Sequence, residues 1–550
     1  MLSYRKLAMR VLGRPLHTGG SDSPRPASQR AAALILTAAM LTTLTAPAFA
    51  KEWYIEEGDI TVRAGETEGT NKVSQGENPE VEDTNTVITN SDKDKASSNT
   101  VTIEAKDKDD KVEVTLKDVN IDTSSRSEAA VSVTGEGNTN IELDGDNALK
   151  SDIYSSGISS SGSLTISGGE NDSLTAQGGS GADGIYSSGS LTISGGTVTA
   201  NGGSGGGGDG GDGIWSSGGV TISGGSTVTA NGGDGKDDYG GDGIRSDSGD
   251  VTISGGSTVT ANGGNGGNVS GDGIRSDSGD VTISGGTVKA AGGDSKDGYG
   301  GDGIRSGGVT ISGGTVNAAG GNGGKVGGYG ICSFARVAIS GGTVNAAGGN
   351  GKNSNGGSDG IISNDINLSG SLELTAKAGR PNGKAISWAG HELDLDTIKD
   401  KLGPGAKVTA TDANGETKQV SSPIPRPVEP EKPVIPEESS SSSDGGSATP
   451  SAPASPLPGL TVTDKDGQRI SYTSTQSGNT LTVCVGRFTA SLRTSLATLR
   501  QLRAEGIETI TFQTILCSTT LSVDELLAMG GEDAEAVLTH RLTASSLTVG

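Results

Sequence analysis

The chain has 550 residues, of which 94 are glycine, 3 are histidine and only 3% are aromatic, and its formal net charge is −24. A charge this negative argues against nucleic acid or an anionic membrane surface as partner, because the long-range field repels both. The few histidines disfavour histidine-dependent catalysis, and three cysteines are too few for a disulfide scaffold.

The first fifty residues have the pattern of a secretory signal peptide. Basic residues precede an apolar run from Ala31 to Leu44, and Ala48-Phe49-Ala50 provides a small-x-small cleavage site. The apolar run is short for a membrane span, and no second stretch of that length follows it. We therefore expect cleavage before Lys51 and a mature protein that is secreted to the extracellular space or held at the cell surface, without a membrane span.

Residues 51–150 contain short runs of alternating apolar and polar residues separated by glycine, asparagine and aspartate. This pattern predicts strands. Stacked repeats need atypical terminal units that cover their open ends. We expect this segment to form an N-terminal cap and the first irregular coils.

One phrase then recurs through residues 151–390 at intervals of about 30. The isoleucine of its Gly-Asp-Gly-Ile motif, or of the matching phrase, falls at Ile185, Ile214, Ile244, Ile274, Ile304, Ile331 and Ile361. Each repeat holds three strand candidates (Ile-x-Ser, Val-Thr-Ile-Ser and Thr-Val-Thr-Ala) and a glycine-rich loop. A fixed period of this size indicates stacked coils. The predicted fold is mainly β, a right-handed parallel β-helix with about 30 residues per coil.

The register of the apolar residues separates this prediction from simple low complexity. Stacked coils would bury two ladders. They are Ile193, Ile222, Ile253, Ile283, Ile311 and Ile339, and Val198, Val228, Val259, Val288, Val316 and Val344. The glycines are expected at corners, where a positive φ is needed.

The remaining segments differ in composition. We expect a C-terminal cap at 391–420, with a short covering helix between Leu393 and Leu402, and a Pro/Ser-rich linker at 421–458. A small α+β module is expected at 459–550. In it, Leu492, Leu496, Leu499 and Leu502 fall on one face of a predicted helix.

Several phrases resemble a family of secreted bacterial β-helix proteins known as carbohydrate-binding domains. They include Trp53–Val62, Lys111–Asp122, Asn140–Asn147 and the Leu164–Gly169 type of repeat. The resemblance covers roughly residues 51–390. It implies a right-handed parallel β-helix that is non-catalytic and binds plant-type or acidic polysaccharide, with calcium in some members.

An aspartate precedes the Gly-Ile pair in most repeats. The positions are Asp183, Asp212, Asp242, Asp272, Asp302 and Asp359. Carboxylates one coil apart would repel by about 3–4 kcal/mol at an effective dielectric constant near 20, and calcium between coils would relieve this repulsion. Alternatively, each aspartate accepts hydrogen bonds from turn amides.

A second calcium hypothesis concerns the loop Gly232–Tyr239, which fits the calcium-binding nonapeptide with Asp237 at its acidic position. True nonapeptide coils repeat every nine residues, whereas this phrase returns once per long repeat. A looser calcium site involving Asp237 stays open.

The residue after the repeat isoleucine gives the candidate ligand-binding column. We expect Tyr154, Tyr186, Trp215, Arg245, Arg275 and Arg305 to form one outward stripe. Aromatic faces stack on sugar rings, and arginine forks match carboxylates. The alternative is an ordinary solvated face whose arginines are balanced by Asp247 and Asp277.

The predicted function is that of a secreted, non-catalytic polysaccharide-binding β-helix, with calcium assistance as a further hypothesis. The main alternative is a structural adhesin or surface rod whose partner is a cell-surface protein. A polysaccharide lyase is less favoured, because such an enzyme would break the repeat with a unique cluster of acids and bases.

Overall fold

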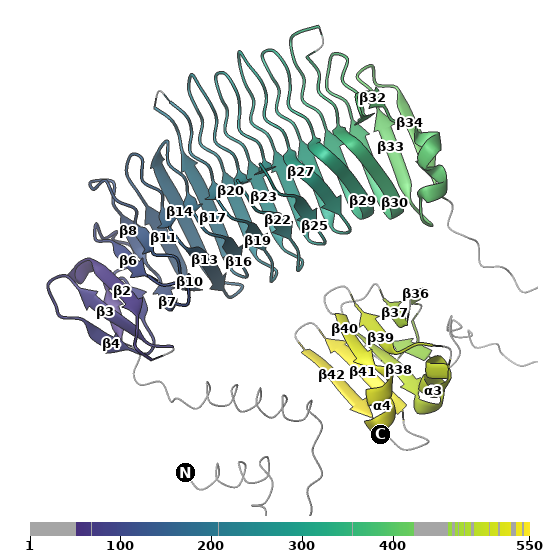
Figure 1. The fold of residues 1–550 in the computed structure, drawn as a ribbon, viewed down its shortest axis with the longest axis horizontal. Helices are drawn as coiled ribbons and strands as arrows, with labels where there is room; N and C mark the ends of the chain where they lie inside the picture. The colour runs from purple at the N-terminus through teal and green to yellow at the C-terminus, as the bar shows by residue number, and fades with distance from the viewer. Residues whose placement is uncertain are drawn as a thin grey trace, which may run out of the picture. The chain divides into compact units, whose positions relative to one another are not determined.

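The computed structural model describes residues 51–422 and 460–549, with single-residue gaps at 68, 207 and 355 and several short gaps after 464. The expected signal peptide and nearly all of the expected linker lie outside the described residues. The chain divides into two compact units, Met1–Arg426 and Pro427–Gly550 (Figure 1).

The first unit is a parallel β-helix of about 13 turns, as the repeat predicts. Three parallel sheets run along it, and we name each by its repeat phrase. The Ile-x-Ser sheet contains β2 (Ile60–Ala64), β6 (Val101–Glu104), β9 (Val131–Thr134), β12 (Ile158–Ser160), β15 (Ile185–Ser187), β18 (Ile214–Ser216), β21 (Ile244–Ser246), β24 (Ile274–Ser276) and β31 (Ile386–Trp388). Three long strands take part in more than one sheet: β27 (Ile304–Ile311), β29 (Ile331–Ala347) and β30 (Ile361–Lys377).

The other two sheets follow the other two phrases. The Val-Thr-Ile sheet contains β1 (Glu52–Tyr54), β5 (Val87–Thr89), β7 (Lys111–Lys117), β10 (Asn138–Asp144), β13 (Ser163–Gly168), β16 (Leu191–Ile193), β19 (Val220–Ile222), β22 (Val251–Ile253) and β25 (Val281–Ile283). The Thr-Val-Thr sheet contains β8 (Asn120–Asp122), β11 (Asp146–Lys150), β14 (Ser173–Ser180), β17 (Thr197–Gly203), β20 (Thr227–Asn231), β23 (Thr258–Asn262), β26 (Thr287–Ala291), β28 (Thr315–Ala319) and β33 (Lys407–Thr411).

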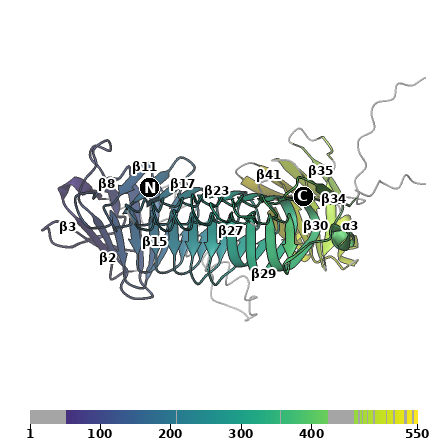
Figure 2. The ribbon, with the colours of Figure 1, turned by 90° about the horizontal axis from the view of Figure 1, so that it is seen from above.

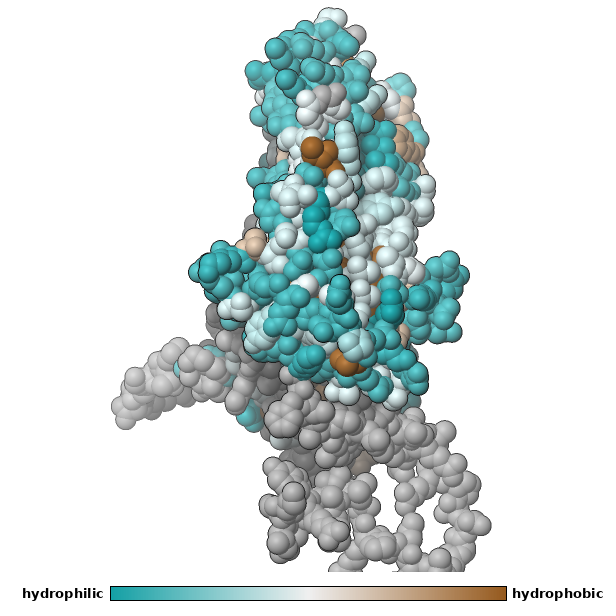
Figure 3. Space-filling view, turned by 90° about the vertical axis from the view of Figure 1, so that its left-hand side faces the viewer, coloured by the Kyte–Doolittle hydropathy of each residue, from teal (hydrophilic) through white to brown (hydrophobic). Residues whose placement is uncertain are grey.

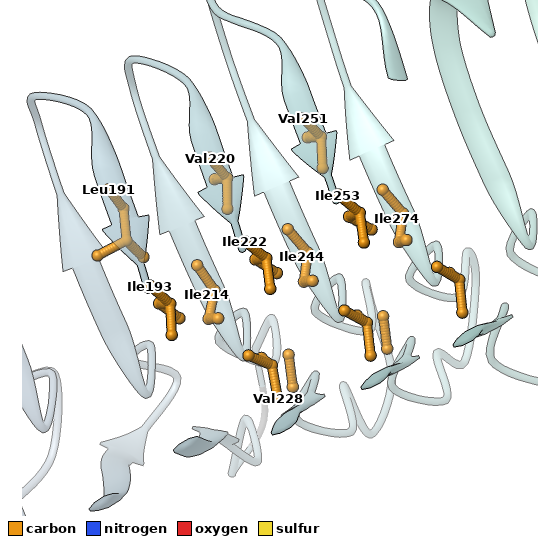
Figure 4. Close-up of a cluster of buried hydrophobic side chains, with 14 of the residues drawn as sticks. Leu191, Ile193, Ile214, Val220, Ile222, Val228, Ile244, Val251, Ile253 and Ile274 are labelled. Carbon is orange, nitrogen blue, oxygen red and sulfur yellow. The ribbon is translucent and has the colours of Figure 1, made fainter. Parts of the chain in front are cut away.

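The predicted ladders form the core. Ile222 pairs in register with Ile253, and Val228 pairs with Val259. Every member of both ladders is buried, with at most 1% of its surface exposed. Figure 4 shows these side chains lying on successive coils and pointing inward. Because each coil offers the same apolar positions, stacking buries them continuously.

The glycines serve two distinct purposes. Those at the corner between the Val-Thr-Ile and Thr-Val-Thr strands have positive φ, such as Gly224 at 67° and Gly255 at 65°, as expected. Most glycines of the long loops, such as Gly241 and Gly271, do not have a positive φ. A Cβ on Gly241 would lie 1.9 Å from the carbonyl oxygen of Gly211, so only glycine fits there. The sequence-based prediction of corner glycines is therefore wrong for the loops, where close backbone packing is the reason for glycine.

These long loops stack on one another as the coils do. The amide of Gly233 donates to the carbonyl of Gly211 in the preceding loop, and the amide of Gly241 donates to Gly233 within its own loop. The pattern repeats through Gly264, Gly271, Gly293 and Gly301. In Figure 1 the loops rise as a row beyond the strands, and Figure 2 shows the coils from above. The loops therefore form a continuous wall.

Both ends of the β-helix carry antiparallel additions. At the N-terminal end, β2 pairs with β3 (Asn71–Gln75), which pairs with β4 (Val81–Asp83), and η1 (Ile55–Glu57) follows β1. The surface of this end is mostly hydrophilic with isolated apolar spots (Figure 3). At the other end lie β32 (His391–Glu392), the 3-10 helix η2 (Leu395–Lys401) and β34 (Thr417–Ser421). Leu395 and Ile398 of η2 are buried, so this helix covers the core where a covering helix is expected.

The second unit has two four-stranded sheets and two helices. One sheet contains β35 (Leu460–Thr463), β38 (Ala490–Ser495), β41 (Glu535–Arg541) and β42 (Ala544–Val549). The other contains β36 (Thr473–Ser477), β37 (Thr480–Cys484), β39 (Thr509–Gln513) and β40 (Ser518–Ser522), and the helices are α3 (Leu496–Ala504) and α4 (Val523–Met529).

The leucine pattern of the second unit is only partly helical. Leu496, Leu499 and Leu502 are the buried face of α3. Leu492 was predicted on the same helix, but it lies in β38, whose own alternation buries it. In the described part of the chain, no helix has the length and apolar character needed to cross a membrane.

Candidate functional site

The residues that follow the repeat isoleucine form one column on the outer side of the Ile-x-Ser sheet. Backbone pairing joins Tyr186 to Trp215, Trp215 to Arg245, Arg245 to Arg275, and Arg275 to Arg305. All five side chains are partly exposed. We call this set the outward column. The sequence therefore predicts the outward placement of these five residues correctly, and their binding of a ligand stays a prediction.

Tyr154 does not belong to the outward column. Ser159 of β12, and not Tyr154, pairs with Tyr186. Tyr154 lies in a turn before β12 with φ 62°, and the residue is 85% exposed. The isoleucine of this coil that pairs with Ile185 is Ile158. Because Ile158 is not preceded by Gly-Asp-Gly, the sequence pattern points to Ile153 instead. The expectation that Tyr154 extends the stripe is wrong.

Neighbouring side chains in the outward column contact one another. The rings of Tyr186 and Trp215 pack edge to face, with their centroids 5.2 Å apart. The guanidinium of Arg245 lies 5.0 Å from the centroid of the Trp215 ring. The indole Nε1 of Trp215 donates to Asp247 at 3.0 Å. The column is therefore an ordered ridge whose side chains hold one another in place.

Two of the arginines are paired with aspartates beside the column. Arg245 contacts Asp247 at 3.0 Å and Asp277 at 3.3 Å, and Arg275 contacts Asp277 at 2.7 Å. Arg275 also lies 3.7 Å from the buried Asp242. These ion pairs match the alternative in which the aspartates balance the arginines.

The buried aspartates form a second column beside the first. Asp183, Asp212, Asp242, Asp272 and Asp302 have 5–8% of their surface exposed. We call them the aspartate column. The Oδ1 of each accepts a hydrogen bond from the backbone amide of the corresponding residue in the next coil, at 2.5–2.7 Å. Tyr329 occupies the next position, and Asp359 accepts from the amide of Lys384 at 2.6 Å.

Burial changes the proton affinity of this column. Removal from water raises the pKa of Asp242 and Asp272 to about 7, and the neighbouring carboxylate adds to the rise. Burial likewise raises the pKa of Asp183 and Asp302 to about 6, and that of Asp212 well above its ordinary value. The amide hydrogen bonds and the nearby arginines oppose these shifts. Near neutral pH, some carboxyl groups of the aspartate column are therefore protonated.

The loop carboxylates make the same kind of hydrogen bond. Asp234 Oδ1 accepts from the amide of Asn265 at 2.8 Å, and Asp294 Oδ1 accepts from that of Asn322 at 2.6 Å. Asp237 is exposed at its loop. Among the described residues, no three His, Cys, Asp or Glu side chains converge as a metal cluster. Calcium binding by the aspartate column or by Asp237 stays a prediction.

A groove of about 310 Å³ lies between the outward column and the loop wall. Trp215, Arg245 and Arg275 line it from the outward column, and Tyr239, Val269 and Ser270 line it from the loops. Asp183, Asp209, Asp212, Asp242 and loop glycines complete the lining. The groove thus combines two aromatic rings with hydrogen-bond donors and acceptors, which is the chemistry of a site for a polar, ring-containing ligand.

The loop residues of this groove were not predicted as ligand-binding. Tyr239 is 48% exposed and pairs with Val269, which pairs with Tyr299, itself 47% exposed. The available signal was the spacing of the two tyrosines by two repeats, in a chain with only eight tyrosines. The variable loop length obscured it.

Comparison with known proteins supports the fold. A family model described as a beta helix repeat matches residues 220–244, 281–304 and 309–331. No curated protein and no solved structure matches the chain. The matched repeats and the stacked coils together define a parallel β-helix repeat protein.

Proposed function

We propose that this chain is a secreted, non-catalytic protein that binds polysaccharide in the groove between the outward column and the loop wall. The observation that carries the proposal is that Trp215 of the outward column and Tyr239 of the loop wall line the same groove. Two aromatic rings in one groove suit the apolar faces of sugar rings. The arginine and aspartate groups of the same lining suit the hydroxyls.

The repeat also favours a chain as ligand over a single sugar. The outward column continues through Tyr186 to Arg305, so equivalent positions recur at about 4.8 Å per coil. A polymer with its own repeat can contact several coils at once. Affinity should therefore rise with oligosaccharide length.

A glycan array followed by isothermal titration tests the proposal. The wild type should bind at least one class of oligosaccharide, and Trp215→Ala and Tyr239→Ala should each weaken binding by about tenfold or more, as loss of an aromatic contact of about 1.5 kcal/mol predicts. Tyr54→Ala is the matched control, because Tyr54 lies in the first coil on β1. Its affinity should equal that of the wild type.

Other outcomes point to the alternative functions. No glycan binding by the wild type would favour a surface rod that binds a cell-surface protein through its terminal module. Shortened sugar chains after incubation would show an enzyme. Calcium assistance is tested by repeating the titration with a chelator.

A further inference from the structure

The three arginines of the outward column differ in what they contact. The guanidinium groups of Arg245 and Arg275 are both engaged by aspartates. Arg305 makes no ion pair with any carboxylate of the described chain, and its guanidinium lies 5.3 Å from the ring centroid of Phe334. Arg305 is therefore held by an aromatic ring while its hydrogen-bond donors stay available.

A shortened repeat explains the difference. Six residues run from Arg275 to Val281, but only four run from Arg305 to Val309, and the aspartate equivalent to Asp277 is missing. Gly307 stacks on Gly279, to whose carbonyl its amide donates a hydrogen bond. Phe334, which is 54% exposed, comes from the next coil on β29. The first arginine of the column, Arg245, therefore contacts the ring of Trp215, and the last, Arg305, contacts the ring of Phe334.

The charges near the groove also differ along its length. Asp247 and Asp277 balance Arg245 and Arg275, and Asp209 adds a further carboxylate to the lining. This part of the site carries no excess positive charge. An anionic group is therefore favoured beside Arg305 and disfavoured between Trp215 and Arg275.

We infer that Arg305 and Phe334 form an anion-binding subsite just beyond the groove, in the coils that follow its lining residue Arg275, and that the ligand is a largely neutral sugar chain with an isolated carboxylate or sulfate ester. This rests on the proposed function and specifies its ligand. A chain that reaches from Trp215 to Phe334 crosses four coil steps, roughly 19 Å at about 4.8 Å each. A polyuronate, charged on every ring, would place carboxylates against Asp247 and Asp277 and should bind more weakly.

The test compares four probes by isothermal titration. They are a xylo-oligosaccharide with one glucuronic acid side group, the same molecule with its carboxyl reduced, a sulfated xylo-oligosaccharide, and an oligogalacturonate of similar length. The wild type should bind the reduced probe about tenfold or more weakly than the singly charged probes, as loss of a charge-assisted hydrogen bond predicts. The preferred singly charged probe identifies carboxylate or sulfate as the anion.

Variants of Arg305 and of the segment after Ser306 test whether the free guanidinium of Arg305 causes the preference for the charged probes. Arg305→Ala should bind the charged and reduced probes equally, and Arg305→Lys should recover only part of the preference, because lysine lacks the planar fork. Insertion of Asp-Ser between Ser306 and Gly307 restores the length of the preceding coil, so the new aspartate should pair with Arg305 as Asp277 pairs with Arg275 and should also remove the preference. Insertion of Asn-Ser at the same place restores the length without the carboxylate. It is the steric control and should keep the preference.

Failure of this inference is distinct from failure of the proposed function. If the wild type and Arg305→Ala bind charged and reduced probes equally well, the groove binds sugar but the subsite is wrong. Tighter binding of the oligogalacturonate than of the singly charged probes would also overturn the inference. Absence of binding to every probe and to the glycan array would overturn the proposed function.

Discussion

The carboxylate of Asp272 accepts a hydrogen bond from the backbone amide of Asp302, 2.6 Å away and one coil further along. Asp242 makes the same bond to the amide of Asp272. The coils are thus tied together by side chains as well as by the strand ladders. Because these carboxyl groups are buried close to one another, the proton content of the column and the stability of the β-helix are linked.

The stability of the β-helix should fall as pH rises from 5 to 8. The pKa of Asp272 in the folded chain is about 7, above its ordinary value of 3.8, so the folded state binds more protons than the unfolded state in this interval. The sign of the linkage then makes unfolding easier at higher pH, by up to about 1.4 kcal/mol per pH unit for one fully titrating group. Tryptophan fluorescence during urea unfolding measures it, since Trp53, Trp215 and Trp388 all lie in the first unit.

Asp272→Asn should weaken this pH dependence. The asparagine oxygen can still accept the amide of Asp302, but the side chain no longer titrates. Asp238→Asn, at an exposed loop position, is the control and should follow the wild type. A slope unchanged by Asp272→Asn would show that the column does not control stability in this interval.

The loop wall should tolerate no side chain at its contact glycines. In Gly241→Ala, the new Cβ would lie 1.9 Å from the Gly211 oxygen, so the loops must separate. We expect a loss of about 1–3 kcal/mol in the free energy of unfolding. Gly285→Ala is the matched control, since a Cβ there meets nothing within 4 Å. Equal effects of the two substitutions would contradict the close packing of the loops.

The core ladder should respond to volume in a graded way. Ile253 is fully buried between Ile222 and Ile283. We expect Ile253→Val to cost about 0.5–1.5 kcal/mol and Ile253→Ala about 2–5 kcal/mol, because the larger deletion leaves a cavity that rigid coils cannot close. The same urea titration measures both. A cost below about 1 kcal/mol for Ile253→Ala would contradict a packed core at this coil.

The arginines of the outward column should separate into structural and ligand-facing residues. Arg275→Ala removes a guanidinium that pairs with Asp277 and lies close to the buried Asp242, and should cost about 1–3 kcal/mol of stability. Arg305→Ala should change stability by less than about 0.5 kcal/mol. A larger loss of stability for Arg305→Ala than for Arg275→Ala would contradict the view that the ion pairs of Arg275 stabilise the fold.

The sequence predicts the coils well because their strongest signals repeat. Ile253 and Val259 recur at equivalent positions in each unit, so period and alternation alone place them inside. Tyr154 fails the same test, because its coil lacks the Gly-Asp-Gly-Ile phrase and one isoleucine can be mistaken for another. The sequence pattern is reliable where many copies of the repeat average out local irregularity. It fails at the coil of Ile158, which precedes the regular Gly-Asp-Gly-Ile repeats.

The groove was less predictable because it depends on contacts between segments with different periods. Tyr239 lies on a loop of variable length, and its presence in the same groove as Trp215 follows from how the loops stack. The spacing of the aspartates was visible, but their hydrogen bonds to the next coil required the backbone register. Likewise, the shortening of the repeat after Ser306 is readable in the sequence, but its consequence for Arg305 is not.

The most direct test of the proposed function is the affinity of Trp215→Ala for the oligosaccharide that the wild type binds best. Binding in the groove predicts a loss of about tenfold or more, with the tryptophan emission of the wild type changing on binding and the β-helix of the variant still folded by circular dichroism. Unchanged affinity in a folded variant would contradict the account.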